Sequence, residues 1–186
     1  MAIGSRCVLR STFEKRPHFA CPLAGEGSSP GRTRGRLNED FLDLFRSLLQ
    51  EEARFIVVGA YAMAAHGVPR ATGDIDIWVA ADEANAVRVF RALAQFGAPL
   101  GALDITAADF AAPDRVVQIG LPPRRIDVLT GVSGIDFASA WAGRASARFA
   151  DLTVPILGRE DLVANKRAAG RPKDLADLAV LDPRST

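Results

Sequence analysis

The spacing of apolar residues along the chain predicts helices and short strands in alternation. Helical spacing begins after Asn38, a candidate N-cap, and recurs at 60–66, 83–96, 135–142, 159–169 and 172–181. Compact or alternating apolar runs predict strands at 55–59, 74–80, 116–120, 125–130 and 152–157, and a short helical turn is expected after Thr106. Strands and helices mixed in this order predict an α+β fold, in which flanking helices pack on one mixed β-sheet.

Two of these helices should turn an apolar face toward the core. On the first helix the expected face consists of Phe41, Leu42, Phe45, Leu48 and Leu49. On the helix at 83–96 it consists of Val87, Phe90, Leu93 and Ala94. Gly97 and Gly170 are suited to end helices, and Pro172 is suited to the first position of the last helix.

The first 36 residues differ in charge from the rest of the chain. Of 23 Lys and Arg and 22 Asp and Glu, seven basic and two acidic residues lie in 1–36, which gives this segment a net charge of +5 and the remainder −4. Within it, residues 24–36 are rich in Gly, Ser, Pro and Arg and have almost nothing to bury. We expect 1–36 to be a disordered basic leader and 37–183 to be a single domain. A nucleic-acid-binding arm is the alternative for the leader.

Other features of the sequence bear on its environment. Cys7 and Cys21 are too few for a disulfide framework or a four-ligand zinc site. The longest apolar stretch, at 55–65, is too short to span a bilayer, and the start of the chain lacks the apolar core of a signal peptide. We therefore expect a cytoplasmic protein with no membrane partner.

The strongest chemical signal is a set of carboxylates on two predicted strands. Strand alternation puts Asp74, Asp76 and Trp78 on one face of 74–80, and puts Arg125 and Asp127 together on one face of 125–130. If these strands are neighbours, three carboxylates converge, and they repel one another unless a cation neutralises them. Mg²⁺ is the natural cation because it prefers hard oxygen ligands. Alternatively, Asp74 caps its strand and Asp127 is an ordinary surface residue.

A second signal lies where the first strand meets the next helix. The apolar strand ends at Gly59, and the amides at the start of the following helix would be free to bind phosphate. Glycine allows a ligand to approach the backbone closely. Taken alone, this signal is weak, because such turns are common in folds that bind nothing.

Together, the two signals resemble a known family signature. The order Val58-Gly59-Ala60, then Asp74-Ile75-Asp76-Ile77 and a later Asp127 resembles the signature of the polymerase-β-like nucleotidyltransferase superfamily. The segments VVGAYAMAAHGVPRATGDIDIWV, QIGLPPRRIDVLTGVSG and EDLVANKRAAGRPKDLADL resemble small bacterial nucleotidyltransferases related to the AbiEii toxins of type IV toxin–antitoxin systems. The resemblance covers about 55–181. This chain departs from the family at Ala60, where Gly or Ser is usual.

The resemblance implies a reaction and a site. Asp74, Asp76 and Asp127 would bind Mg²⁺, or Mn²⁺ in its place, and transfer a nucleoside monophosphate from a nucleoside triphosphate to a hydroxyl. The acceptor would be an RNA 3′ end, a protein or a small molecule, and an antitoxin protein would be a partner. The amides of Gly59 and Ala60 would hold phosphate. Arg70 and Thr72, in the loop before the acidic strand, are further candidates for nucleotide contacts, although Arg70 could instead hold the carboxylates in place or cap the preceding helix.

The C-terminal segment 165–178 adds a cluster of cations. Lys166, Arg167, Arg171 and Lys173 lie within eight residues, around the turn between the last two helices. The related toxins use a lysine and an aspartate here, which implies a triphosphate contact by Lys166, oriented by Asp174 or Asp177. The alternative is a solvated helical hairpin with pairs such as Lys173 with Asp177.

The sequence also allows a function without catalysis. A catalytically silent module of the same fold, which binds a nucleotide or a partner without turnover, would account for Ala60. Tyr61, His66 and Trp78 are interpreted as packing or capping residues.

Overall fold

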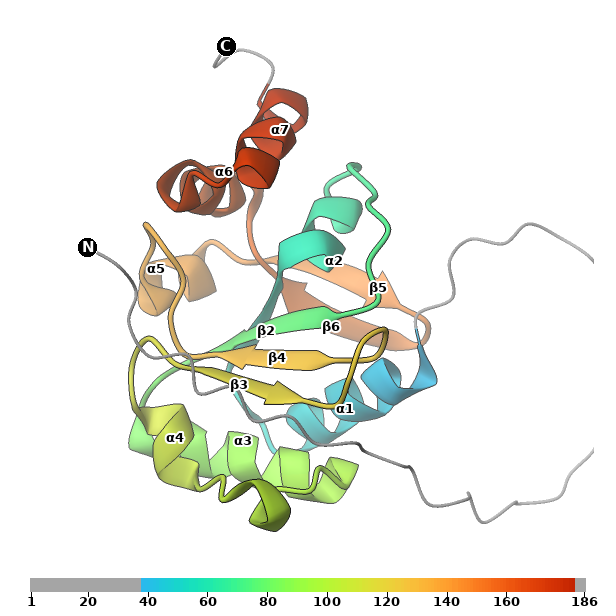
Figure 1. The fold of residues 1–186 in the computed structure, drawn as a ribbon, viewed down its shortest axis with the longest axis vertical. Coiled ribbons are helices and arrows are strands. Elements are labelled where there is room, and N and C mark those ends of the chain that lie inside the picture. The colour runs from blue at the N-terminus through green and yellow to red at the C-terminus, as the bar shows by residue number, and fades with distance from the viewer. Residues whose placement is uncertain (1–37, 183–186) are drawn as a thin grey trace, which may run out of the picture.

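A computed structural model describes residues 38–182 as an α+β fold built on one six-stranded sheet (Figure 1). The strands are β1 (Phe55–Val58), β2 (Ile75–Val79), β3 (Val116–Ile119), β4 (Ile126–Leu129), β5 (Ala145–Phe149) and β6 (Leu152–Ile156). They lie in the order β3-β4-β2-β1-β6-β5. The pairs β2–β4 and β1–β6 are parallel and the other three pairs are antiparallel, so the predicted mixed sheet is confirmed.

Helices cover both faces of this sheet. The helices α1 (Glu39–Gln50), α3 (Glu83–Phe96) and α4 (Ala107–Ala111), with the 3-10 turn η1 (Gly101–Leu103), pack on one face. The helices α2 (Gly59–Ala65), α5 (Phe137–Ala142), α6 (Arg159–Ala169) and α7 (Pro172–Leu181) pack on the other. Figure 1 shows α6 and α7 as a hairpin on the side of the sheet opposite α3 and α4.

Side-chain alternation divides the core into two apolar clusters. In β2, Ile75, Ile77 and Val79 are buried with α1 and α3, whereas Trp78 is buried in the cluster that contains α2 and α5. Burying apolar side chains on both faces is the main stabilising contribution in a sheet of this kind. Because β2 alternates, Asp76 lies on the same face as Trp78.

The helix ends follow the predicted local signals. The side chain of Asn38 accepts a hydrogen bond from the backbone of Asp40, as expected of an N-cap. Gly97 and Gly170 end α3 and α6 with left-handed φ values of 89° and 59°, and Pro172 opens α7.

The predicted inner faces of two helices are wrong in part. In α1 the buried set includes Leu44, while Leu42 is only half-buried and Leu49 is exposed. In α3 the exposed residues include Val87 and Ala94. The buried stripe of α3 consists instead of Asn85, Ala86, Val89, Ala92 and Leu93. The buried stripe faces α1 and α4, against which α3 packs, and this packing leaves Val87 exposed.

One strand was not predicted. The strand β5 has the weakly apolar sequence ASARF and forms an antiparallel hairpin with β6, in which Phe149 lies opposite Leu152. The turn between them has Ala150 at a positive φ of 54° instead of the Asn-Gly or Asp-Gly pair that usually marks a hairpin. The sequence of β5 does alternate, with Ala145, Ala147 and Phe149 packed against the core, but two of these three residues are alanines, which are weak strand formers, and the turn residues do not mark a hairpin.

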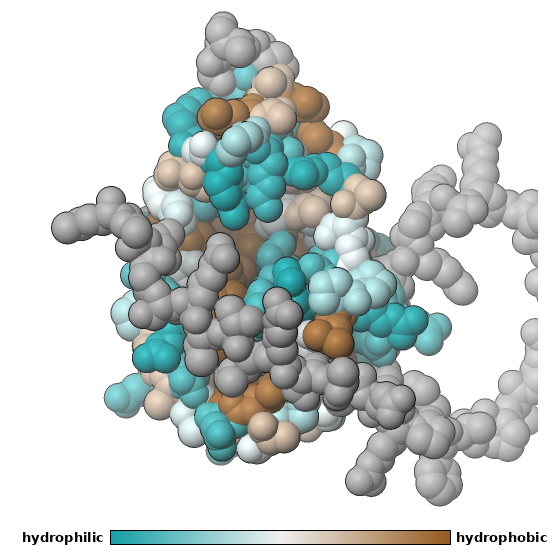
Figure 2. Space-filling model, viewed as in Figure 1, coloured by the Kyte–Doolittle hydropathy of each residue, from teal (hydrophilic) through white to brown (hydrophobic). Residues whose placement is uncertain are grey.

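Two further observations concern the surface and the termini. Leu175 and Val180 on α7 are 54% and 58% exposed, and Figure 2 shows apolar residues beside polar ones over the α6–α7 hairpin. Within residues 38–182, no helix has both the length and the apolar character needed to cross a membrane. The predicted leader at 1–36, with Cys7 and Cys21, lies outside the residues that the structure describes.

Candidate active site

The sheet brings the predicted carboxylates together. Strands β2 and β4 are parallel neighbours, and Asp76 lies directly opposite Asp127 in their register. Asp74 immediately precedes β2, where the backbone N–H of Ile75 donates to the carbonyl of Arg125 at 2.9 Å. The predicted convergence of Asp74, Asp76 and Asp127 is therefore confirmed.

Arg125 bridges two of these carboxylates. Its Nη2 lies 2.9 Å from Asp74 Oδ2 and 3.0 Å from Asp127 Oδ2, and its Nε lies 2.8 Å from Asp127 Oδ1. Gln118 on β3 also donates to Asp127 Oδ1 at 3.2 Å. The planar guanidinium thus holds Asp127 through both oxygens and reaches Asp74 with the same group.

Asp76 has no such partner. Within residues 38–182 its side chain makes neither a hydrogen bond nor an ion pair. Burial, and then the charge of Asp127, raise the pKa of Asp76 to about 6, although Lys173 and Arg125 act in the opposite direction. Burial likewise raises the pKa of Asp127 in spite of its bonds to Arg125. The positive charge around the cluster is therefore too small to offset burial and mutual repulsion. Keeping Asp76 and Asp127 ionised costs the folded state free energy.

Gly59 lies against this cluster at the junction of β1 and α2. Its φ is +61°, and a Cβ at this position would lie 2.1 Å from Asp76 Oδ2, closer than any real contact. Val58, the residue before it, is the register partner of Asp76. Glycine is thus required here both by the left-handed backbone and by the space that Asp76 occupies. The glycine turn and the acidic strand form one site, as the sequence spacing indicated.

The donor set suits a divalent cation only in part. Three aspartates offer the hard oxygen ligands that Mg²⁺ prefers, and Asp74 Oδ1 is buried without a hydrogen-bond partner among the described residues. Across 38–182, however, no group of three or more acidic, His or Cys side chains is arranged to hold a metal ion. Arg125 instead supplies the positive charge between Asp74 and Asp127. The residue types fit Mg²⁺, but Arg125 engages three of their oxygens.

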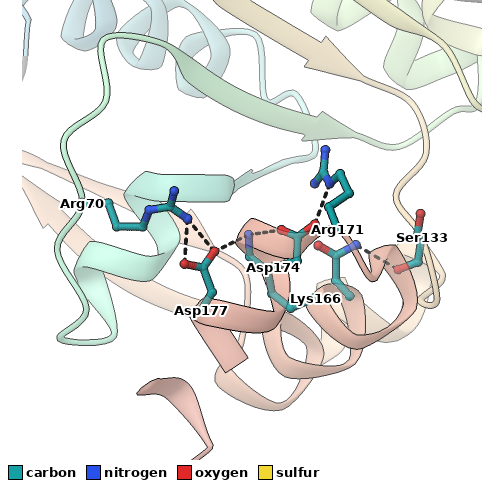
Figure 3. Close-up of polar contacts among 7 residues, drawn as sticks. Arg70, Ser133, Lys166, Arg171, Asp174 and Asp177 are labelled. Atoms are coloured by element: carbon teal, nitrogen blue, oxygen red, sulfur yellow. Dashed lines mark hydrogen bonds and ion pairs between the residues drawn. The ribbon is translucent and has the colours of Figure 1, made fainter. Parts of the chain in front are cut away.

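A second charged network lies in the α6–α7 hairpin (Figure 3). Lys166 Nζ lies 2.7 Å from Asp174 Oδ1 and 2.9 Å from Asp177 Oδ2. Arg70 Nη1 reaches Asp177 at 2.6 Å, and Arg171 Nε reaches Asp174 at 2.5 Å. Lys166 is only 7% exposed and Asp174 is fully buried. Burial opposes ionisation of Asp174, but the hydrogen bonds from Arg171 and Lys166 prevail and lower its pKa.

The structure shows the contacts of Lys166, Arg70 and Thr72, which the sequence left open. Lys166 pairs with both aspartates, where one was expected. Arg70 neither contacts the Asp74 cluster nor caps α2, and instead ties the loop before β2 to α7 through Asp177. The hydroxyl of Thr72 donates to the carbonyl of Asp74 at 3.0 Å and accepts from its N–H at 3.3 Å, which shapes the loop. Contacts of Arg70, Thr72 and Lys166 with a nucleotide remain predictions.

The sequence assigned Lys173 a partner only in the alternative of a solvated hairpin, where it would pair with Asp177. That pair is not formed, since Asp177 pairs with Arg70 and Lys166. Among residues 38–182 Lys173 has no ion-pair partner, and its charge lowers the pKa of Asp76. The hairpin therefore places a cation without an ion pair, among the described residues, close enough to Asp76 for its charge to act on that carboxylate. No sequence spacing could have singled it out, because this depends on how α7 packs.

The aromatic residues and the histidine near the site are packing residues, as predicted. Trp78 is buried and packs edge-on against Phe137, with ring centroids 5.1 Å apart. Tyr61 packs edge-on against Phe41. His66 Nε2 lies 2.7 Å from the carbonyl oxygen of Leu157, which ties the end of α2 to the segment after β6.

Comparison with known proteins adds no family to this picture. The chain matches no protein-family model and no curated protein. The resemblance to nucleotidyltransferases therefore rests on the motifs of the sequence.

Proposed function

We propose that this protein is a Mg²⁺-dependent nucleotidyltransferase with a polymerase-β-like fold, related to the AbiEii toxins. It would transfer a nucleoside monophosphate from a nucleoside triphosphate to an acceptor hydroxyl and release pyrophosphate. One observation carries the proposal: Asp76 and Asp127 lie in register on parallel neighbouring strands, with Asp74 at the entrance and Gly59 against Asp76. Such a cluster of carboxylates beside a glycine turn suits a cation-bound triphosphate.

Each residue of the site has a role in this proposal. Asp74, Asp76 and Asp127 would hold Mg²⁺ or Mn²⁺, and the chemistry that the bound cation supplies is stabilisation of charge on the attacking and leaving oxygens. By the family resemblance, Asp127 would accept the proton of the acceptor hydroxyl. The hydroxyl oxygen forms a bond to the α-phosphorus, and the bond to the pyrophosphate oxygen breaks. The backbone amides of Gly59 and Ala60 would hold the phosphates.

The α6–α7 hairpin would supply positive charge to the triphosphate. The buried pairs of Lys166 with Asp174 and Asp177 fix the hairpin, and the pair of Arg70 with Asp177 fixes it to the loop that leads into β2. Lys173, without an ion pair in the described part of the chain, is then the cation most available to phosphate. Arg70, Thr72 and Lys166 would contact the nucleotide on the side that faces the α6–α7 hairpin.

The silent binding module is the second candidate, and one observation favours it. Arg125 forms ion pairs with both Asp74 and Asp127, so the chain itself supplies part of the positive charge that these carboxylates need, as a site that has lost turnover could do. Ala60 in the glycine turn agrees with this alternative. In that case a nucleotide or a protein partner would bind without reaction.

A transfer assay separates the two candidates. The protein is incubated with each α-³²P-labelled nucleoside triphosphate, Mg²⁺ and total RNA, and label on RNA, on protein and on small molecules is measured together with pyrophosphate release. The enzyme predicts label on one acceptor class, lost in Asp76→Asn and retained in Glu160→Gln, which removes an exposed carboxylate on α6. Nucleotide binding without transfer would favour the silent module, and neither binding nor transfer would refute the proposal.

A further inference from the structure

Arg125 stands at the end of the β3–β4 connection, two residues before Asp127 and on the same strand face. Its backbone is fixed, because its carbonyl accepts a hydrogen bond from the N–H of Ile75 at 2.9 Å. Its side chain is not fixed by anything other than the acidic cluster: within residues 38–182 every hydrogen bond and ion pair of the guanidinium goes to Asp74 or Asp127. The side chain is also 30% exposed. Among the described residues, the guanidinium would therefore break no other hydrogen bond or ion pair on leaving the cluster.

The guanidinium occupies the oxygens that a metal ion would need. It contacts Asp74 Oδ2 and both oxygens of Asp127, at 2.8 to 3.0 Å. A carboxylate oxygen engaged this closely by one cation is a poorer ligand for a second cation, because the two positive charges repel at short range. The guanidinium and a divalent cation therefore compete for these three oxygens.

Arg125 does not neutralise all the negative charge of the three aspartates. Three aspartates share one arginine, and Asp76 makes no ion pair among the described residues. Asp74 Oδ1 is buried and unpartnered in the same part of the chain. Arg125 thus leaves part of the negative charge of the cluster without a partner. A divalent ion that binds these remaining oxygens could displace the guanidinium.

We propose that Arg125 is an internal counter-cation that competes with divalent metal for Asp74 and Asp127. It keeps the acidic cluster together in the absence of metal and weakens the binding of metal alone. Once displaced, its guanidinium is free to form paired hydrogen bonds with a phosphate, which it does better than a lysine would. The inference rests on the proposed function, since that function makes the cluster a metal site.

Binding of Mn²⁺ without nucleotide tests this role directly. Titration of the full chain is followed by the loss of the free-ion signal in electron paramagnetic resonance, for the wild type and for Arg125→Gln. We expect Arg125→Gln to bind Mn²⁺ at least tenfold more tightly than the wild type. The matched control is Arg124→Gln, which removes the neighbouring arginine; its side chain is 70% exposed and lies 3.7 Å from Asp40. This control should bind as the wild type does.

Further variants keep the test decisive. Arg125→Lys retains the charge but not the planar fork, and should bind Mn²⁺ with intermediate affinity, so it replaces Arg125→Gln if that variant does not fold. Equal or weaker Mn²⁺ binding by Arg125→Gln, beside a wild type that does bind, would overturn the inference and leave the proposed function standing. Absence of Mn²⁺ binding in every variant, with no nucleotide binding, would overturn both. Asp76→Asn added to Arg125→Gln should abolish the gain.

Discussion

Replacing Asp76 by asparagine should stabilise the protein at neutral pH. Asp76 lies in β2 between Val58 and Asp127, faces Gly59, and has no hydrogen bond or ion pair among the residues that the structure describes. Burial and the charge of Asp127 raise its pKa from 3.8 to about 6. Asparagine has nearly the same shape and no charge, so it removes the cost of keeping a carboxylate ionised there.

The size and sign of the effect follow from this pKa. A pKa displaced by one unit corresponds to about 1.4 kcal/mol, so ionised Asp76 costs the native state about 3 kcal/mol. Because the native state holds the proton more tightly, the wild type loses stability as pH rises from about 4 to about 6. The advantage of Asp76→Asn should therefore be absent near pH 4 and complete above pH 7. For a domain of this size it corresponds to a rise in Tm of roughly 6–12 °C.

Urea unfolding in metal-free buffer at pH 4, 5, 6 and 7.5 measures this difference. Glu160→Gln serves as the control, because it removes an exposed carboxylate outside the cluster and should change little at any pH. An Asp76→Asn variant that is equally or less stable than the wild type at pH 7.5 would refute the reasoning. A stability gain that does not vary between pH 4 and 7.5 would also refute it, because the gain would then not come from the charge.

Three further substitutions probe the surroundings of the site by equilibrium unfolding. Gly59→Ala should lower the free energy of unfolding by at least about 2 kcal/mol more than Gly67→Ala does. Both positions have positive φ, but only at Gly59 would the Cβ meet Asp76 Oδ2. Equal losses in the two variants would contradict a steric requirement for glycine beside Asp76. Lys166→Met should lower the free energy of unfolding by about 3 kcal/mol, because it removes the buried cation shared by Asp174 and Asp177 and leaves them only the more exposed Arg171 and Arg70, against under about 1 kcal/mol for the exposed Arg167→Met; similar losses in the two variants would contradict a structural role for Lys166. Asn85→Ala should cost about 2–3 kcal/mol, because its buried amide bonds the backbone of Arg54 and Ala80; a loss below 1 kcal/mol would contradict that.

The acidic cluster could be predicted because strand geometry is simple. Alternation alone puts Asp76 and Trp78 on one face, and a single assumption, that the two acidic strands are neighbours, brings Asp127 beside them. Gly59 could also be placed, because a glycine between a buried strand and a helix signals a special backbone conformation. These inferences depend on local patterns, which a sequence shows directly.

What the sequence could not show depends on packing between distant segments. The pairing of Arg70 with Asp177 joins residues 107 positions apart, and no local pattern marks it. The inner stripe of α3 is set by its packing against α1 and α4, which leaves the more hydrophobic Val87 exposed. Arg125 could be placed on the face of Asp127, but its reach to Asp74 required the structure.

The measurement that tests the central claim most directly is a thermal-shift series with ATP, GTP, CTP and UTP, each with and without Mg²⁺, on the wild type and on Asp74→Asn. A ligand at about 100 times its Kd adds roughly 2.7 kcal/mol, or a rise of roughly 5–10 °C in Tm for a domain of this size. We predict that at least one triphosphate gives such a rise only with Mg²⁺, and that Asp74→Asn abolishes it. No Mg²⁺-dependent rise with any triphosphate, or an equal rise in Asp74→Asn, would contradict the assignment of Asp74, Asp76 and Asp127 as a nucleotidyltransferase site.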